Sequence, residues 1–456
     1  MDNVVSKEVN RNQIKFMQWD ITKRCNLKCK HCRSTSYYDG ADGDKIIDLT
    51  TEEVFKTLDD LAKNGVNRIH FLGGEPFMRK DLLEIIRYGN KKGIVSSINT
   101  NGTLLTPEIV DEILKSRVYL LTFSLDGASK KTNDFIRGEG VYDKVCNNIR
   151  LVDKIRKQRK QYLRIITSPV ITKVNCHEAV EFVNLAKDLG LDSIIFTTLR
   201  KKGRAKENMD DLGLTQQEEL DFAEQIAELI HNGTKQHIQL GVGSPLFIEY
   251  LNKKYNINLP ILPGGCNSLK QKGFIHPDGS LFPCQELTQF YITNGETNSI
   301  QRNKILDTSF QNIWESRNYL ELFNLMFNND HRNKNKPCDK CKYYSSFCFP
   351  CPLASMNNTQ VNYHYSCIEA IRRAESNNIY LNLDEDILVD SQTIIHKAVH
   401  EPNFRNDLIF NQETATKINR FKLNPEESQK LTDVILAVKN RVNNCINNIN
   451  IKEREW

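Results

Sequence analysis

Apolar and polar positions follow two different periodicities along the first 200 residues. Short runs of apolar and β-branched residues, which predict strands, alternate with segments that carry an apolar residue every three or four positions, which predict amphipathic helices. The expected strands are 14–20, 67–73, 94–99, 118–125, 162–171 and 193–199. Strand–helix repetition of this kind predicts an α/β fold with a parallel sheet and helices outside, either a (βα)6 partial TIM barrel or an open sheet.

Several helix ends can be located from capping residues. Thr50 followed by Glu53 is a capping-box pattern, and Gly65 is a suitable stop. Thr106 with Pro107 next to it predicts another helix start. Further helices are expected at about 175–189, 215–231 and 245–254. In either kind of sheet, the loops that follow the strands form the reactive face.

The character of the sequence changes after residue 262. Residues 263–370 are rich in Gly, Pro and Cys with short strands, as expected of a small domain stabilised by metal. Helical patterns return afterwards, and Asn424, Pro425 and Glu427 mark one capped start. We therefore divide the chain into 1–210, bridging helices 211–262, the Cys-rich 263–370 and a helical C-terminal extension 371–456.

Composition excludes few functions. With 456 residues, 39% of them hydrophobic and 26% charged, the chain is of ordinary globular type. The net charge of +5 does not indicate nucleic acid. The basic runs 154–161 and 200–206 are interpreted as solvated helix faces or loops, with a groove for an acidic partner as the alternative. No apolar run is long enough for a membrane and no secretion signal is present, so we expect a cytoplasmic protein.

Thirteen cysteines are the most informative feature of the composition. An odd number in a reducing compartment argues against a disulfide framework. Cys25, Cys29 and Cys32 follow the first expected strand with x3 and x2 spacing. Three thiolates on one loop can hold three corners of a cubane iron–sulfur cluster and leave one iron open. The alternative is a zinc site with a fourth ligand such as His31.

These cysteines and four later motifs resemble the radical S-adenosylmethionine (SAM) superfamily. GGEP at 73–76, NTNG at 99–102, SLDG at 124–127 and IRG at 136–138 occur in that order. The resemblance covers about residues 14–200. It implies that Cys25, Cys29 and Cys32 bind a [4Fe-4S] cluster whose open iron chelates SAM.

The same resemblance implies a set of cofactor contacts. Glycines permit close backbone approach, and Arg is a natural partner for a carboxylate. The contacts implied are Gly73, Gly74 and Glu75 for the methionyl amino group, Ser124, Arg137 and the supporting Asp126 for the carboxylate and ribose, His31 and Leu199 beside the adenine, and Asn101 of NTNG.

A second group of cysteines lies in the Cys-rich segment. Alone, the two Cys-x2-Cys pairs at 338–351 would indicate a zinc ribbon. After a radical SAM half, the arrangement resembles the SPASM domain with its two auxiliary [4Fe-4S] clusters. That resemblance implies Cys266, Cys284 and Cys351 for the first cluster, and Cys338, Cys341, Cys348 and Cys367 for the second. The spacing departs slightly from the commonest one, and no fourth cysteine lies near Cys266, so the first cluster has either an open iron or a non-cysteine ligand.

The three remaining cysteines have different interpretations. Cys146 lies on the apolar side of an expected helix and is interpreted as a small buried hydrophobe. Cys445 is interpreted as structural or incidental. Cys176 is expected at a helix start on the reactive face, where a helix N-terminus lowers a thiol pKa. A thiol there could donate a hydrogen atom to a substrate radical, and the alternative is an ordinary helix-start residue.

The resemblance implies that SAM is cleaved to a 5′-deoxyadenosyl radical, and SPASM-type relatives act mostly on peptides. Sulfatase-maturating relatives have an aspartate after the cysteine that matches Cys284, whereas this chain has Gln285 and then Glu286, which disfavours that activity. We predict a peptide maturase that forms a cross-link or inverts a centre in a ribosomal natural product. The alternatives are a radical SAM enzyme for a small molecule or cofactor precursor, and a zinc-stabilised interaction protein.

The partners expected from the resemblance are a precursor peptide and an electron donor of flavodoxin or ferredoxin type. Only 24 residues precede Cys25, which leaves no room for an N-terminal leader-recognition domain. A separate leader-recognition protein, or the extension 371–456, could take the place of that domain. The other interpretation of 371–456 is a helical extension that packs on the core. Neither nucleic acid nor a membrane is expected as a partner.

Overall fold

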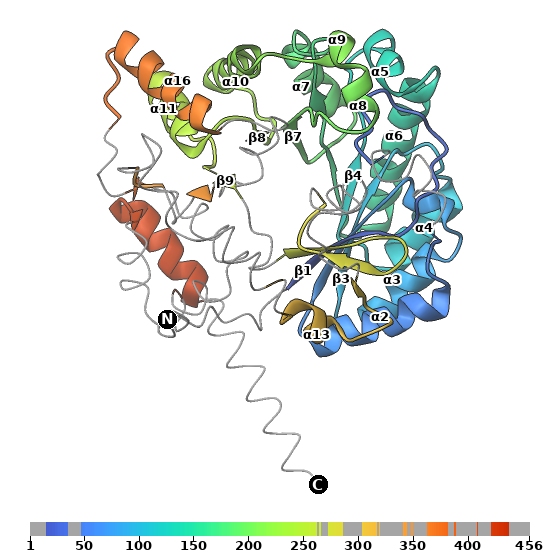
Figure 1. Cartoon of the computed structure of the whole chain (residues 1–456). Coiled ribbons are helices and arrows are strands. Elements are labelled where there is room, and N and C mark those ends of the chain that lie inside the picture. The colour runs from blue at the N-terminus through green and yellow to red at the C-terminus, as the bar shows by residue number, and fades with distance from the viewer. Residues whose placement is uncertain are drawn as a thin grey trace.

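Strands and helices alternate along the first half of the chain, as the pattern predicts (Figure 1). The computed structural model describes residues 15–34, 47–261, 264–265, 272–285, 303–316, 319, 341–343, 348–349, 363–381, 387–388, 408 and 421–436. Within these ranges, most strands belong to one 11-stranded sheet.

The strands of the first half lie side by side in chain order and are parallel. They are β1 (Phe16–Asp20), β2 (Arg68–Leu72), β3 (Val95–Thr100), β4 (Leu120–Phe123), β5 (Arg164–Thr167) and β7 (Ser193–Thr198), followed by β8 (Ile238–Gly241). Parallel strands need crossover connections. The helices that provide them are α2 (Thr51–Lys63), α3 (Leu82–Lys91), α4 (Pro107–Lys115), α5 (Lys130–Arg137), α6 (Val141–Arg159) and α7 (Ala179–Asp188). The α/β fold that the sequence predicts is confirmed.

The predicted helix caps are confirmed as well. Thr50 Oγ1 accepts the Glu53 N–H at 3.3 Å, and the Glu53 carboxylate accepts the Thr50 N–H at 2.8 Å. Thr106 Oγ1 accepts the Ile109 N–H at 3.3 Å, with Pro107 as the first residue of α4. These helix starts are fixed by local side-chain chemistry, which explains why the sequence locates them.

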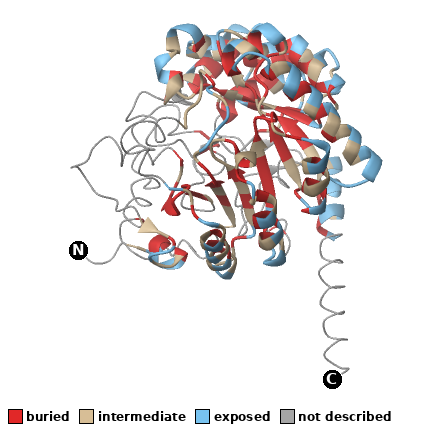
Figure 2. Ribbon diagram, turned by 90° about the vertical axis from the view of Figure 1, so that its right-hand side faces the viewer, coloured by how far each residue is buried: buried red, intermediate tan, exposed pale blue. Residues whose placement is uncertain are grey.

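The two faces of the sheet differ. Trp19, Phe71 and Leu121 point to the helical layer and are fully buried in the main core. Successive side chains of a strand point to opposite faces, so Gln18 and His70 point the other way, and both are only partly buried. Figure 2 shows buried strands beneath helices whose outer surfaces are exposed. The helices therefore cover one face, and the other is left as a partly open inner face.

One expected strand is divided in two. The run 162–171 forms β5 and a separate β6 (Val170–Ile171), both of which pair with β7. Ser168 and Pro169 lie between them, and Pro169 has no N–H to donate to a ladder. The prediction of one continuous strand is wrong for this reason.

The second half of the chain continues the same sheet. The hairpin of β10 (Lys272–Ile275) and β11 (Ser280–Phe282) places β10 parallel to β1, and β12 (Asn303–Lys304) pairs with β11. The sheet thus crosses the boundary that we predicted at residue 262. The other described elements are α8 (Arg204–Glu207), α9 (Met209–Leu212), α10 (Gln216–His231), α11 (Pro245–Tyr255), β9 (Gly264–Gly265), α13 (Phe310–Trp314), β13 (Cys348–Phe349), α16 (Tyr363–Ser376), β14 (Ile387–Leu388) and β15 (Phe421–Lys422).

The C-terminal region contains a helix over 425–436, and Asn424 Oδ1 accepts the Glu427 N–H at 2.8 Å as its cap. Helix α16 runs across the predicted boundary at 370. Over the part of the chain that the structure describes, no helix is both long and apolar enough to cross a membrane.

Candidate functional site

The three cysteines of the first motif lie on the loop that follows β1. Cys25 is exposed, Cys32 is half-buried and Cys29 is buried. The Cys32 N–H donates to the Cys29 carbonyl oxygen at 3.2 Å, which makes the loop a tight turn. Burial raises the pKa of the Cys29 thiol to about 11. A bound metal ion stabilises the thiolate form of such a thiol.

The GGEP segment after β2 packs directly against this cysteine loop. The Gly74 and Glu75 N–H groups donate to the carbonyl oxygens of Thr22 and Arg24, each at 2.8 Å. A Cβ atom at Gly74 would collide with the Arg24 carbonyl oxygen, and one at Gly73 with that of Thr22. Glycine is required at both positions because the two backbones approach too closely for a side chain.

Glu75 and Asn101 join the GGEP segment to the loop after β3. The buried Glu75 carboxylate accepts hydrogen bonds from Thr100 Oγ1 and the Asn101 N–H, both at 2.7 Å. The Asn101 amide donates to Asn26 Oδ1 of the cysteine loop at 2.8 Å. Burial raises the pKa of Glu75 to about 7. Both residues therefore connect loops, and their contact with SAM stays a prediction.

Asp126, His31 and Arg137 form a buried charged cluster next to the cysteines. Asp126 Oδ2 lies 2.7 Å from His31 Nε2 and 2.6 Å from Arg137 Nη2. Arg137 Nη1 lies 3.8 Å from the Cys29 sulfur. Burial by itself would raise the pKa of Asp126, but Arg137 and His31 lower it below its usual range. The structure thus brings together three of the predicted cofactor residues.

One contact of the cysteine loop was missed by the sequence analysis. Arg204, the first residue of α8, donates through Nε to the Cys29 carbonyl oxygen at 2.9 Å and through its N–H to that of Cys32 at 3.0 Å. Arg204 belongs to the basic run 200–206, which we interpreted as a solvated segment. That interpretation is wrong for Arg204. Its place after the strand of residues 193–199, on the reactive face, is the only sequence signal that pointed to it.

Ser124 and Leu199 follow the ends of β4 and β7. Ser124 is half-buried. Leu199 is buried with Ile136 and Ala205 in a small apolar cluster that is separate from the main core. These two neighbours directly precede and follow Arg137 and Arg204, the arginines that contact the cysteine loop. Contact of Ser124 and Leu199 with SAM stays a prediction.

Cys176 lies in a turn that precedes α7. The helix begins at Ala179, and the Cys176 sulfur lies 3.7 Å from the Lys173 carbonyl oxygen. Burial and the nearby Glu218 carboxylate raise the pKa of this thiol. The expectation that a helix N-terminus lowers its pKa is therefore wrong, because the thiol is not at the helix start. Its role as a hydrogen-atom donor stays a prediction.

The end of the β10–β11 hairpin reaches the cysteine loop. Cys284 follows β11 and is half-buried. Gln285, the next residue, accepts a hydrogen bond from Arg33, which follows Cys32. A residue of the Cys-rich segment is thus in direct contact with the residue that follows the first motif.

Only some of the other cysteines of the second group lie within the described residues. Cys341, Cys348 and Cys367 are buried. The Cys348 N–H donates to the carbonyl oxygen of Tyr343 at 2.7 Å. Cys266, Cys338 and Cys351 lie outside the described residues, as do Glu286 and Cys445. Cys146 is buried in the main core, as predicted.

The donor set of the site fits a cluster with a polar ligand beside it. Each thiolate of a cubane binds its own iron, and the loop supplies three thiols. Among the described residues, no three His, Cys, Asp or Glu side chains are placed to share a single metal ion. Within the same ranges, His31 Nδ1 and Arg137 Nε are buried without a hydrogen-bond partner. Buried polar atoms are normally paired, so these two fit the polar groups of a bound molecule such as SAM.

Comparison with known proteins agrees with this chemistry. Residues 19–186 match the model of the Radical SAM superfamily, and residues 266–342 match that of SPASM, an iron–sulfur cluster-binding domain. An AdoMet-dependent heme synthase from Methanosarcina barkeri is 29% identical over 346 residues, which are 73% of this chain and 89% of that protein. The mycofactocin maturase MftC from Mycolicibacterium smegmatis is 28% identical over 310 residues, 67% of this chain and 71% of that protein.

A solved structure shares the fold. SuiB from Streptococcus suis, bound to its precursor peptide SuiA, aligns with a TM-score of 0.57 at 16% identity, over 77% of this chain and 75% of that chain. At this identity the likeness shows the fold alone. The predicted partial barrel followed by a SPASM domain is confirmed.

Proposed function

We propose, from the premise that this chain belongs to the radical SAM superfamily and carries a SPASM domain, that it modifies a peptide. Membership makes it an enzyme that uses SAM and iron–sulfur clusters. When bound, the reduced cluster and SAM supply a 5′-deoxyadenosyl radical, which removes a hydrogen atom from an unactivated carbon. The residues of the chain bind and orient the reactants and exclude water.

In this proposal, the residues around the first motif hold the cofactors. Cys25, Cys29 and Cys32 hold the cluster. Arg137, oriented by the buried Asp126, binds the SAM carboxylate. The backbone of Gly73 and Gly74, with Glu75, receives the amino group. Ser124, Asn101, His31 and Leu199 complete the cofactor contacts.

The observation that carries the peptide assignment is a row of polar side chains on three strands of the inner face of the sheet. Gln18, His70 and Ser97 are register partners on β1, β2 and β3. His70 Nδ1 lies 2.7 Å from Ser97 Oγ. Burial lowers the pKa of His70 to about 4, so the ring is neutral at pH 7, and because Nδ1 is paired with Ser97 it offers Nε2 to a substrate. Asn99, on the same face of β3, adds an amide. These groups suit the amides of a peptide backbone. The similarity to a mycofactocin maturase supports the same class.

A porphyrin is the second candidate substrate, because a heme synthase matches 73% of this chain. A flat apolar macrocycle is best held by apolar and aromatic walls. The middle of the register row on the inner face, Gln18, His70 and Ser97, is polar instead, between Phe274 of β10 and Leu120 of β4. This difference in polarity is why we favour a peptide.

The radical chemistry also needs an electron, for which we propose a flavodoxin- or ferredoxin-type donor in the cytoplasm. Arg24 and Lys28 flank the exposed Cys25 and are themselves exposed. Their positive charge suits an acidic protein that docks near the cluster. We further propose that a separate protein recognises the leader of the precursor peptide.

The substrate class can be tested with the anaerobically reconstituted enzyme. Release of 5′-deoxyadenosine is measured with SAM and a reductant, in the presence of short peptides encoded beside the gene or of an iron porphyrin. We expect the peptide to accelerate release and to be modified in the same reaction. Acceleration by the porphyrin alone would assign the enzyme to the second class.

The kind of modification can be determined from the product mass. A cross-link makes the peptide lighter by about two hydrogens and incorporates no deuterium from heavy water, whereas an inverted centre gains one deuterium. If Cys176 donates the hydrogen atom to an inverted centre, Cys176→Ala releases 5′-deoxyadenosine but no epimer. Unchanged product formation in this variant favours the cross-link.

A further inference from the structure

Helix α11, which lies in the bridge between the two halves, is tied to two cysteines of the second group through one carboxylate. Lys342 Nζ and Tyr343 Oη donate to the two oxygens of Glu249 on α11 at 3.0 and 2.8 Å. All three side chains are buried. Lys342 and Tyr343 directly follow Cys341, and the Tyr343 carbonyl oxygen accepts the Cys348 N–H.

The same helix is tied to a third cysteine through its N-terminus. Cys367 lies on α16. Ser366, the preceding residue, accepts the N–H of Ser244 at 2.8 Å and lies 3.2 Å from the Ser244 hydroxyl. Ser244 caps α11. Cys341, Cys348 and Cys367, which belong to the predicted second auxiliary cluster, are thus all linked to one helix.

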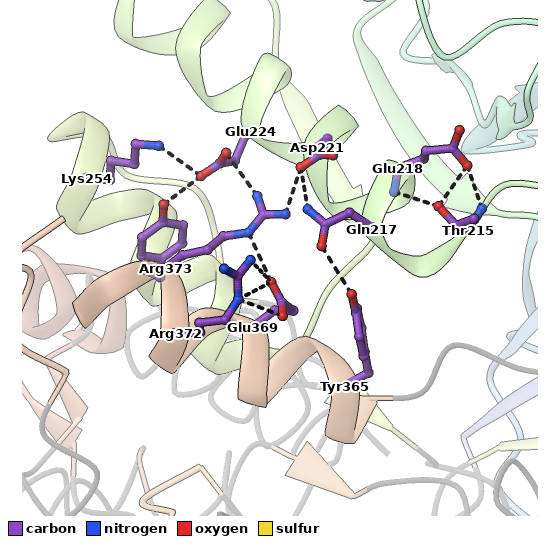
Figure 3. Close-up of polar contacts among 11 residues, drawn as sticks. Thr215, Gln217, Glu218, Asp221, Glu224, Lys254, Tyr365, Glu369, Arg372 and Arg373 are labelled. Carbon is purple, nitrogen blue, oxygen red and sulfur yellow. Dashed lines mark hydrogen bonds and ion pairs between the residues drawn. The ribbon is translucent and has the colours of Figure 1, made fainter. Parts of the chain in front are cut away.

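Arg373 fixes α16 at its other end. Its guanidinium lies 2.7 Å from Asp221 and 3.0 Å from Glu224, both on α10 (Figure 3). It also lies over the ring of Phe247 on α11, 5.5 Å from the ring centre. Only 9% of the Arg373 side chain is exposed. The planar guanidinium can bridge two carboxylates in a fixed geometry, which an ammonium group cannot do.

The helices that receive Arg373 are themselves fixed to the sheet. Phe222 of α10 packs edge-on against Phe196 of β7 with ring centres 5.0 Å apart. A continuous path of contacts therefore runs from the barrel sheet through α10 and the buried Arg373 to the helix that carries Cys367.

We propose that α11, with α10, is a preformed platform that holds Cys341, Cys348 and Cys367 in place relative to the barrel before iron binds. Glu249 and Arg373 are the positioning residues of this platform. The proposal does not depend on the substrate. It makes assembly of the second auxiliary cluster depend on contacts made by residues that are not themselves cluster ligands.

The chain contains a matched control for Arg373. Arg372, the adjacent residue of the same helix, pairs with Glu369 at 2.7 Å, and 61% of its side chain is exposed (Figure 3). Replacing either arginine by methionine removes the same charge from α16. Only Arg373→Met removes the contact with α10.

The test measures the rate at which each thiol of the metal-free full-length chain is alkylated. Mass spectrometry identifies the alkylated cysteines. We expect Arg373→Met to speed alkylation of Cys367 at least about tenfold, because it removes the side chain that joins α16 to both α10 and α11, which favours local opening. Arg372→Met should leave the rate unchanged. After reconstitution, Arg373→Met should lack about four irons per chain and still cleave SAM. Alkylation of Cys146, buried in the barrel core, reports whether the barrel stays folded.

Wild-type alkylation of Cys367 and a wild-type iron content in Arg373→Met would overturn the proposal. If Arg373→Met also exposes Cys146, the experiment is repeated with Arg373→Lys. Lysine keeps the charge but cannot bridge both carboxylates. Faster alkylation of Cys367 in Arg373→Lys, with Cys146 protected, supports the platform. An unchanged rate refutes it.

Discussion

At the scale of single residues, the site depends on one buried carboxylate. Asp126 is fully buried and is shared by His31 and Arg137, which itself contacts Cys29. Removing one partner of a buried ion pair leaves an uncompensated charge, which is far more costly than losing an exposed pair. Asp126 therefore holds His31 and Arg137, the two residues that we propose contact the cofactor, in place.

We expect Asp126→Asn to lower the free energy of unfolding by about 3 kcal/mol and to weaken SAM binding. Asp143→Asn is the control, since Asp143 and Lys130 form a pair at the same 2.6 Å but are more than half exposed. Urea denaturation of the two variants is the measurement. Equal losses in both variants would show that burial of Asp126 does not matter.

Glu75 should make the free energy of unfolding fall as pH rises, which is the opposite of the usual effect of a carboxyl group. Its pKa is raised from 4.5 to about 7 by burial. Between these values the folded protein keeps a proton that the unfolded chain has released, so the free energy of unfolding falls as pH rises. The loss across this window is about 3 kcal/mol. Urea denaturation of wild type and Glu75→Gln from pH 4.5 to 8 should show this fall in wild type only; parallel curves would contradict it.

At the scale of elements, the site is formed by loops that touch through their backbones. The GGEP segment donates two N–H groups to carbonyl oxygens of the cysteine loop, and Arg204 of α8 donates to two others. No side chain fits between the first two segments. The position of the three thiols therefore depends on glycines after the neighbouring strand.

Gly74→Ala should displace the cysteine loop, because its Cβ would collide with the Arg24 carbonyl oxygen. We expect the reconstituted variant to lack about four irons per chain and to lose SAM cleavage. In the control Gly89→Ala, the nearest atom to the new Cβ is 3.8 Å away and the residue lies within α3. That variant should be as stable as wild type or more stable by up to about 1 kcal/mol. Iron analysis and SAM cleavage compare the two, and full iron content in Gly74→Ala would contradict the expectation.

At the scale of the whole molecule, the two halves share one sheet. β10 pairs in parallel with β1, and Gly273 of β10 lies between Met17 of β1 and Trp314 of α13. The Phe310 N–H of α13 donates to Asp60 of α2 at 2.6 Å. Figure 1 shows α13 beside α2. The barrel therefore needs residues beyond 262 to cover an edge strand and part of its core.

We expect a fragment of residues 1–262 to be insoluble or to lack a cooperative unfolding transition. Without β10, the hydrogen-bonding edge of β1 and apolar side chains such as Met17 are exposed, which favours aggregation. The full chain in the same buffer is the control. Circular dichroism during heating measures the unfolding of both proteins. A soluble fragment that unfolds at the same temperature as the full chain would show that the two halves are independent.

The local features of this protein were predictable from its sequence. Strands, helices and their caps, such as those at Thr50 and Thr106, follow from periodicity and from side chains that bond to neighbouring N–H groups. The order of the cysteine, GGEP, NTNG and SLDG motifs at the ends of successive strands resembled the radical SAM superfamily, and that resemblance supplied the expected chemistry.

The tertiary structure alone decided the long-range features. It paired Asp126 with His31 and Arg137, placed Arg204 on the cysteine loop and joined β10 to β1. It also divided the strand at Pro169 and placed Cys176 in a turn with a raised pKa. These features depend on burial and on contacts between residues far apart in the chain. Periodicity and local capping carry no information about such contacts, which is the physical reason that the sequence could not supply them.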